Sequence, residues 1–150
     1  MQALAEAEPI ARLIAAARRQ IGQAVALRVR RHGLNPQRFW LLINIRETPG
    51  LSLRELARRL RADEPTASRI VAGLKRRRLV QVRSDPRDRR RHCLELTDRG
   101  AALADAVAPI AAEVRMGVEA GLGPEEKDTL RRLLTRVIEN ARRLDQESET

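Results

Sequence analysis

The sequence predicts a mainly α-helical fold with one small β-hairpin. Three observations indicate it. Apolar residues recur at helical spacing through most of the 150 residues, helix caps precede several of these stretches, and one short region alternates like paired strands. Hydrophobic residues make up 43% of the chain, which is enough for an aliphatic core, and Phe39 and Trp40 are the only aromatic residues. The expected order is four helices, a hairpin and two further helices.

A glycine that ends the first predicted helix and an asparagine that caps the second separate the two. Apolar residues share one helical face over roughly residues 9–31, and Gly33 ends that helix. Asn35 caps the next helix, with a proline at its first position. The stretch 39–43 is apolar on every side, so this second helix is expected in the middle of the protein.

Two short helices with basic outer faces follow. Ser52 and Glu55 form a capping box, in which each side chain accepts from the other's main-chain N–H. Asp63 is the expected cap of the second short helix. The inward positions are aliphatic: Leu53, Leu56, Ala57 and Leu60, then Ala67, Ile70, Val71 and Leu74. Two short helices about four residues apart have the form of a helix-turn-helix.

The pattern then changes to strand, turn and strand. Residues 80–83 and 89–96 predict the two strands of a β-hairpin with a very basic tip. Thr97 caps another helix, the glycines and proline of residues 121–124 interrupt it, and residues 130–144 predict a last amphipathic helix. The acidic tail from residue 145 is expected to fray.

The positive charge is concentrated in one segment. The chain has a net charge of +10, and 28 of its 30 basic residues are arginine. Residues 51–91 hold 14 basic and 5 acidic residues, whereas residues 92–150 hold 8 basic and 12 acidic ones. This distribution favours a polyanion-binding module, and nucleic acid is the leading partner.

The second helix of a helix-turn-helix enters the major groove of DNA and reads base edges with its N-terminal residues. The residues expected to contact DNA from this recognition helix are Pro65, Thr66, Ser68, Arg69 and Arg76. Those expected to contact phosphates are Arg54, Arg58, Lys75 and Arg77. Arg69 fits either guanine or a phosphate. As the alternative, Thr66 and Ser68 are ordinary first-turn hydrogen bonders and the arginines are solvated charges.

The hairpin tip is the most distinctive feature. The residues expected to bind DNA there are Arg87, Arg89, Arg90 and Arg91. Asp85 and Asp88 lie among them, where carboxylates weaken a purely electrostatic patch, so we expect both to brace the turn. Our hypothesis pairs Asp88 with Arg90 and places Arg87 in a narrow minor groove. A solvated charged turn is the alternative.

The run Asp85 to Arg90, followed by residues 94–100, resembles the wing signature of the MarR family of winged-helix transcription regulators. Residues 33–39, 53–60, 69–71 and 79–80 resemble other stretches of that family, so the resemblance covers roughly residues 10–144. Family members usually have glycine where Arg78 stands. If Arg78 adopts a left-handed conformation, the cost is about 1 kcal/mol.

The resemblance implies a homodimeric, cytoplasmic repressor that binds a near-palindromic operator as double-stranded DNA. It divides the chain into an N-terminal dimerisation helix (1–33), a winged helix-turn-helix core (34–98) and C-terminal dimerisation helices (99–150). The abundant apolar surface of the outer helices independently favours a dimer. The resemblance also implies release by a small aromatic or lipophilic effector, and His32 and Trp40 are the candidate pocket residues. Core packing is the alternative for Trp40.

Other function classes find less support. Cys93 could make the protein a redox-responsive regulator, although a single strand cysteine is more often a packing residue. A nonspecific duplex-binding protein also fits the charge. The sequence holds no phosphate loop, zinc motif or catalytic constellation, so we expect no enzyme activity, cofactor or metal. RNA stacking would need exposed aromatics. No apolar run approaches the roughly 18 residues of a membrane span, and no leader pattern opens the chain, so we expect an intracellular protein without membrane binding.

Overall fold

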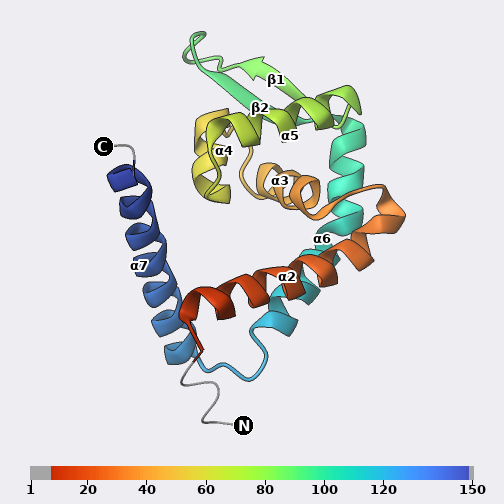
Figure 1. Ribbon diagram of the computed structural model, residues 1–150. Helices are drawn as coiled ribbons and strands as arrows, with labels where there is room; N and C mark the ends of the chain where they lie inside the picture. Colours follow the sequence, from red (N-terminus) through yellow and green to blue (C-terminus); the bar gives the residue numbers. More distant parts are fainter. Residues whose placement is uncertain (1–7, 149–150) are drawn as a thin grey trace. The chain divides into compact units, whose positions relative to one another are not determined.

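The computed structural model describes residues 8–148 (Figure 1), and the chain divides between Val114 and Arg115 into two compact units. Its elements, in chain order, are α2 (Ile10–Val29), η1 (Arg30–His32), α3 (Pro36–Glu47), α4 (Leu53–Leu60), α5 (Glu64–Arg76), β1 (Val80–Ser84), β2 (His92–Leu96), α6 (Asp98–Val118) and α7 (Pro124–Ser148). The predicted fold class, mainly α with one β-hairpin, is confirmed.

The four predicted N-caps are present, and the Thr97 hydroxyl, which caps α6, accepts from the Gly100 N–H at 3.0 Å. The Asn35 Oδ1 atom accepts a hydrogen bond from the main-chain N–H of Arg38 at 2.8 Å. Ser52 and Glu55 close the reciprocal capping box at the start of α4. The Asp63 carboxylate accepts from the main-chain N–H of Thr66 at 2.7 Å, which starts α5. Each cap satisfies N–H groups that the first turn of a helix leaves without a partner.

The core of the first unit surrounds α3. Phe39, Leu41 and Leu42 are completely buried, as the apolar run of this helix predicts. Figure 1 shows α3 in the middle of this unit, and it packs against α2, α4, α5 and β2. The central helix α3 therefore packs against both helices of the helix-turn-helix, α4 and α5.

The hairpin is antiparallel, with Val80 opposite Leu96 and Ser84 opposite His92. The main-chain N–H of Leu94 also donates to the Leu51 carbonyl at 2.7 Å, which fastens β2 to the segment before α4. The prediction that the second strand begins at Arg89 is wrong, because β2 begins at His92.

Residues 89–91 belong to the turn for a local reason. The Asp85 N–H donates to the Arg91 carbonyl at 2.8 Å, and the Arg91 N–H donates to the Asp88 carbonyl at 2.9 Å. These bonds close the chain on itself between the strands. The turn is therefore longer than the alternation in the sequence indicates, and it is fixed by its own backbone.

Two arginines occupy left-handed backbone conformations. Arg78, between α5 and β1, has φ 57°, as its position in place of glycine predicts, and Arg61, which ends α4, has φ 50°. A side chain in this region crowds the following carbonyl group, and glycine avoids that contact.

We therefore expect Arg78→Gly to stabilise the protein by about 0.5–1 kcal/mol, measured by urea unfolding. Arg76→Gly, two residues earlier at the last position of α5, is the matched control and should destabilise by up to about 1 kcal/mol. Equal destabilisation by both glycines would contradict the assigned strain.

The second unit consists of the end of α6 and the long helix α7. The Gly123 N–H donates to Glu126 Oε2 at 2.7 Å, and Glu119 pairs with Lys127 at 3.0 Å, so the turn before α7 is tied to its first residues. The expectation that the tail frays from residue 145 is wrong for residues 145–148, where α7 continues, and residues 149 and 150 lie outside the described part of the chain. Residues 142–146 include arginine, leucine and glutamine, which have high helix propensity.

Within residues 8–148, none of the helices combines the length and the apolar character that a bilayer crossing requires.

Candidate nucleic-acid interface

The start of α5 presents the predicted recognition residues in two different states. Pro65, Ser68 and Arg69 are exposed. Thr66 is half-buried, and its hydroxyl donates to Asp63 Oδ2 at 2.8 Å while accepting from Arg69 Nη2 at 3.3 Å. Thr66 therefore serves the cap of the helix, as the alternative interpretation of this residue states. The exposed face that remains for a groove is formed by the other three and by Arg76.

The predicted phosphate contacts also differ among themselves. Arg58 and Lys75 are exposed on the outer faces of α4 and α5. Arg54 is exposed and stands 3.8 Å from the Glu64 carboxylate. Arg77 is half-buried, and its Nη1 donates to the Gly33 carbonyl at 2.7 Å. Arg77 thus ties the end of α5 to the turn before α3.

The two wing aspartates hold the turn through main-chain groups. Asp85 Oδ1 accepts from the Arg87 N–H at 2.8 Å, and Asp88 Oδ1 accepts from the Arg90 N–H at 3.0 Å. These are Asx turns, in which a short carboxylate replaces a main-chain acceptor. Asp88 thus pairs with Arg90 through the main-chain N–H of Arg90 and not through its guanidinium. The side chains of Arg87, Arg89 and Arg90 remain exposed.

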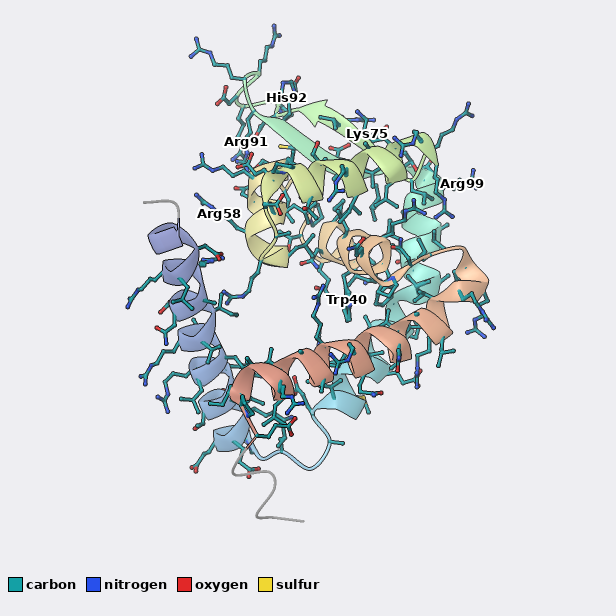
Figure 2. The ribbon with its side chains drawn as sticks, viewed as in Figure 1. Trp40, Arg58, Lys75, Arg91, His92 and Arg99 are labelled. Atoms are coloured by element: carbon teal, nitrogen blue, oxygen red, sulfur yellow. The ribbon has the colours of Figure 1, made fainter. Side chains whose placement is uncertain are left out.

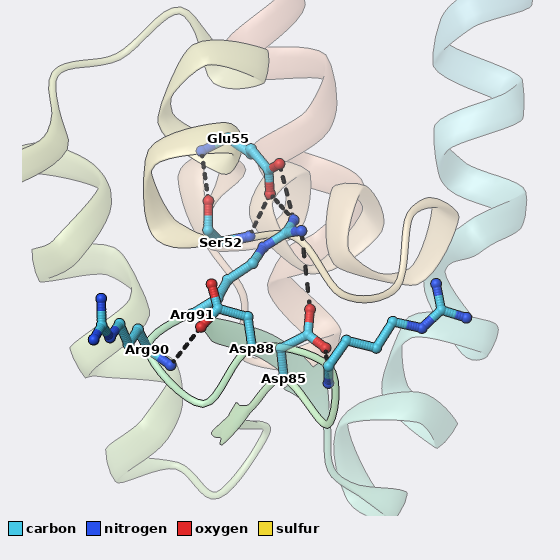
Figure 3. A network of polar contacts seen from close by, with 7 residues as sticks. Ser52, Glu55, Asp85, Asp88, Arg90 and Arg91 are labelled. Carbon is cyan, nitrogen blue, oxygen red and sulfur yellow. Dashed lines mark hydrogen bonds and ion pairs between the residues drawn. The ribbon is translucent and has the colours of Figure 1, made fainter.

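Arg91 differs from the other wing arginines because it reaches across to α4 (Figure 3). Its Nη2 atom donates to both carboxylate oxygens of Glu55, at 2.8 and 2.9 Å, and its Nη1 lies 3.9 Å from Asp85. The same Glu55 carboxylate accepts from the Ser52 N–H at 2.7 Å. One side chain therefore closes the cap of α4 and fastens the wing to it.

The charge states of this pair follow from these contacts. Hydrogen bonds from Ser52 and then from Arg91 hold the pKa of Glu55 below its ordinary value, and Glu55 raises the pKa of Arg91. Because the folded-state pKa of Glu55 is lowered, its contribution to stability is complete above the ordinary glutamate pKa. That contribution is lost as the pH falls through the lowered value.

We expect Glu55→Gln and Arg91→Gln each to weaken duplex binding several-fold, because either change frees the wing from α4. The double variant should lose little more than one single variant, since both changes remove the same interaction. The thermal midpoints of wild type and Glu55→Gln should converge as the pH falls through the lowered Glu55 pKa. Additive losses in duplex affinity would instead make Arg91 a direct DNA contact.

Residues 51–91 hold 14 basic and 5 acidic residues, an excess of 9 positive charges, and each carboxylate lies at a cap, a turn or a basic side chain. Glu55 and Asp63 cap helices, Asp85 and Asp88 bind turn N–H groups, and Glu64 lies beside Arg54. All five carboxylates of residues 51–91 thus have local structural roles. The exposed arginines of α4, α5 and the wing therefore form a surface suited to a polyanion.

Figure 2 shows Arg58, Lys75, Arg91 and His92 around α4, α5 and the hairpin, whereas the Trp40 side chain extends from α3 toward α2. Trp40 is partly buried against the core, and its ring meets Phe39 edge-on with centroids 4.7 Å apart. His32 is half-buried, with Nε2 3.3 Å from Arg31 Nε. The core packing of Trp40 agrees with the alternative to a ligand role.

Sequence reasoning missed two residues at this surface. Glu55 was recognisable as a cap, but its bond to Arg91 joins residues 36 positions apart, which no local pattern reveals. Arg38 also lines a recess beside α5, and its place in an otherwise apolar helix was the only available signal. The described part of the chain contains no group of three or more His, Cys, Asp or Glu side chains placed to hold a metal ion.

A model described as the MarR family matches residues 32–91, which include the helix-turn-helix and most of the wing. The HTH-type transcriptional repressor NicR of Pseudomonas putida is 36% identical over 102 residues, which are 68% of this chain and 65% of that repressor. The chain thus matches somewhat less than two thirds of this relative's length.

Solved structures extend the similarity to nearly the whole chain. The structure of BpsR from Bordetella bronchiseptica, a protein whose DNA binding is regulated by 6-hydroxynicotinic acid, is 26% identical with a TM-score of 0.72, and the match covers 87% of this chain and 93% of that one. The Staphylococcus aureus MepR–DNA complex shares the fold, with a TM-score of 0.77, 21% identity and coverage of 89% and 96%. With the capped recognition helix and the braced wing, these matches show a winged-helix fold that is similar to the MarR family over the helix-turn-helix and most of the wing.

Proposed function

We propose that this protein is a transcription regulator that binds double-stranded DNA. One observation carries the proposal: α5 and the wing present exposed arginines, while every carboxylate of residues 51–91 has a structural role. A helix fits the major groove, and arginine fits the negative potential of a narrow minor groove. The repressor NicR and the MepR–DNA complex support the same assignment.

The protein acts as a homodimer in this proposal. On α2, Ile10, Leu13 and Leu27 are exposed apolar side chains, and on α7 the exposed ones include Leu130 and Leu144. Apolar surface of this kind on two outer helices favours burial against a second copy. A two-fold dimer presents two recognition helices to half-sites about one DNA turn apart, which requires a near-palindromic operator.

A small aromatic effector is the proposed release signal. Support comes from BpsR, whose DNA binding is regulated by 6-hydroxynicotinic acid. Trp40 is the only tryptophan, so its fluorescence reports on the proposed pocket beside His32. A compound that releases DNA without changing that fluorescence would count against Trp40 as a pocket residue.

Enrichment of genomic duplexes by the purified protein tests the main proposal. We expect one near-palindromic sequence to be selected, and Arg69→Ala and Arg87→Ala each to weaken its binding, with a cost of about 1–3 kcal/mol if the residue reads bases. Arg46→Ala is the matched control. It also removes one arginine, but that arginine lies on α3 and its Nε is 2.7 Å from the Asp105 carboxylate. Binding without any selected sequence would indicate the nonspecific duplex-binding alternative.

The redox alternative has its own test. Cys93 is buried, with 8% of its surface exposed, which disfavours direct attack by peroxide. Peroxide treatment with mass detection of Cys93, coupled to duplex binding, should leave both thiol and affinity unchanged. Oxidation of Cys93 that releases DNA would establish a redox-responsive regulator instead.

A further inference from the structure

A polar recess of about 290 Å³ lies between the start of α3 and the first half of α5. It is lined by Asn35, Gln37, Arg38, Thr66, Arg69 and Ile70. On the other edge of α5, Ser68, Ala72 and Lys75 face the hairpin residues Val82 and His92. The recess and the wing therefore flank opposite edges of the recognition helix.

Arg38 is held in this recess by both neighbouring helices. Its main-chain N–H donates to Asn35 Oδ1, which fixes its position in the first turn of α3. Its guanidinium lies over Gly73 of α5, where a Cβ atom would be 3.5 Å from Nη2 and 3.7 Å from Nε. Because Gly73 has no side chain, the Arg38 guanidinium can lie close to the backbone of α5.

The recess carries an excess of positive charge, although the Asp63 carboxylate attracts Arg69 electrostatically. No carboxylate lines it, and Asp63, the cap of α5, already accepts from the N–H and the hydroxyl of Thr66. Among the described residues, the Arg38 guanidinium has no hydrogen-bond or ion-pair partner. Arg69 adds a second guanidinium, whose only hydrogen bond within residues 8–148 goes to the neutral Thr66 hydroxyl. Two guanidinium groups beside a helix N-terminus favour an anion with several acceptor oxygens.

We propose that this recess binds a backbone phosphate of duplex DNA, with Arg38 and Arg69 as its two cationic ligands. The inference rests on the proposed function and deepens it. A helix in the major groove has a phosphate strand on each side, and the recess meets one strand while the wing side meets the other. Arg69 then positions the helix, and base reading falls to Pro65, Ser68 and the neighbouring exposed face.

The test compares Arg38→Gln with wild type on the selected duplex and on a scrambled duplex, over a series of salt concentrations. We expect affinity for both duplexes to fall by the same factor, at least about 10-fold. The slope of log affinity against log salt should become shallower by about 1 for each phosphate that is no longer neutralised, or about 2 for a dimer. Arg38→Lys keeps the charge and should keep the wild-type slope, a readout that a purely structural role would not restore.

Arg69→Gln should reproduce the uniform loss, whereas a base-reading Arg69 would lose affinity for the selected duplex alone. Arg46→Gln, at the opposite end of α3, is the control and should leave the slope unchanged. An unaltered slope for Arg38→Gln, or a loss confined to the selected duplex, would overturn the phosphate assignment. Failure of the wild type itself to bind duplex DNA would instead refute the proposed function.

Discussion

Raising monovalent salt from about 50 mM to about 200 mM is expected to weaken duplex binding by about 10³- to 10⁵-fold, because the proposed dimer neutralises about 6 to 10 phosphates. The exposed basic side chains of α4, α5 and the wing are numerous enough for this, and the local carboxylates are engaged in caps and turns. Each neutralised phosphate releases condensed counterions, so the loss is governed by the number of phosphates bound and not by base identity.

Fluorescence anisotropy at several salt concentrations measures this effect. A wing variant with Arg87, Arg89 and Arg90 all changed to glutamine should give a shallower slope, by about 0.9 for each phosphate that the variant leaves unbound. Arg46→Gln should retain the wild-type slope, since that arginine pairs with Asp105 away from the proposed surface. Affinity that stays within about 10-fold over this salt range would rule out backbone phosphates as the main source of binding.

Replacement of Gly100 by alanine is expected to destabilise the protein by at least about 3 kcal/mol, the upper end of the usual cost of overpacking. A Cβ atom at this position would overlap the Leu79 carbonyl oxygen and lie 2.8 Å from the Leu79 carbonyl carbon. The Leu79 carbonyl cannot easily move, because it accepts the Thr97 N–H at 3.1 Å. Alanine would therefore push α6 away from the end of the recognition helix.

Urea unfolding of Gly100→Ala and Gly117→Ala separates this steric overlap from helix propensity. Gly117 is also in α6, but a Cβ there meets nothing within 4 Å, so alanine should be neutral or stabilise by up to about 1 kcal/mol. If Gly100→Ala unfolds at the same urea concentration as wild type, then α6 does not approach Leu79 as closely as described.

Features with a local cause were predictable from the sequence. The caps at Asn35, Ser52 and Asp63 each act on a residue three positions later, so a short pattern contains the whole interaction. The buried run of α3 was predictable from its own residues, whereas the left-handed Arg78 was expected only from the resemblance to a family that usually has glycine there.

Features that depend on distant contacts were not predictable. The main-chain bonds of the wing turn displaced the start of β2 from Arg89 to His92, although the alternation of residue types gave no sign of it. The predicted DNA contacts Arg91 and Arg77 have partners within the folded chain, Glu55 and the Gly33 carbonyl, that their charge did not reveal. The charge of a residue indicates an affinity for acceptor oxygens, and only the fold decides which acceptor is within reach.

The start of α6 has a mechanical consequence for the recognition helix. The Thr97 hydroxyl donates to the Arg78 carbonyl at 2.6 Å, and its N–H donates to the Leu79 carbonyl. The same hydroxyl accepts from the Gly100 N–H at 3.0 Å. Thr97 thus links residues 78–79, between α5 and β1, to the first turn of α6, and its amide should exchange its hydrogen only when these bonds open.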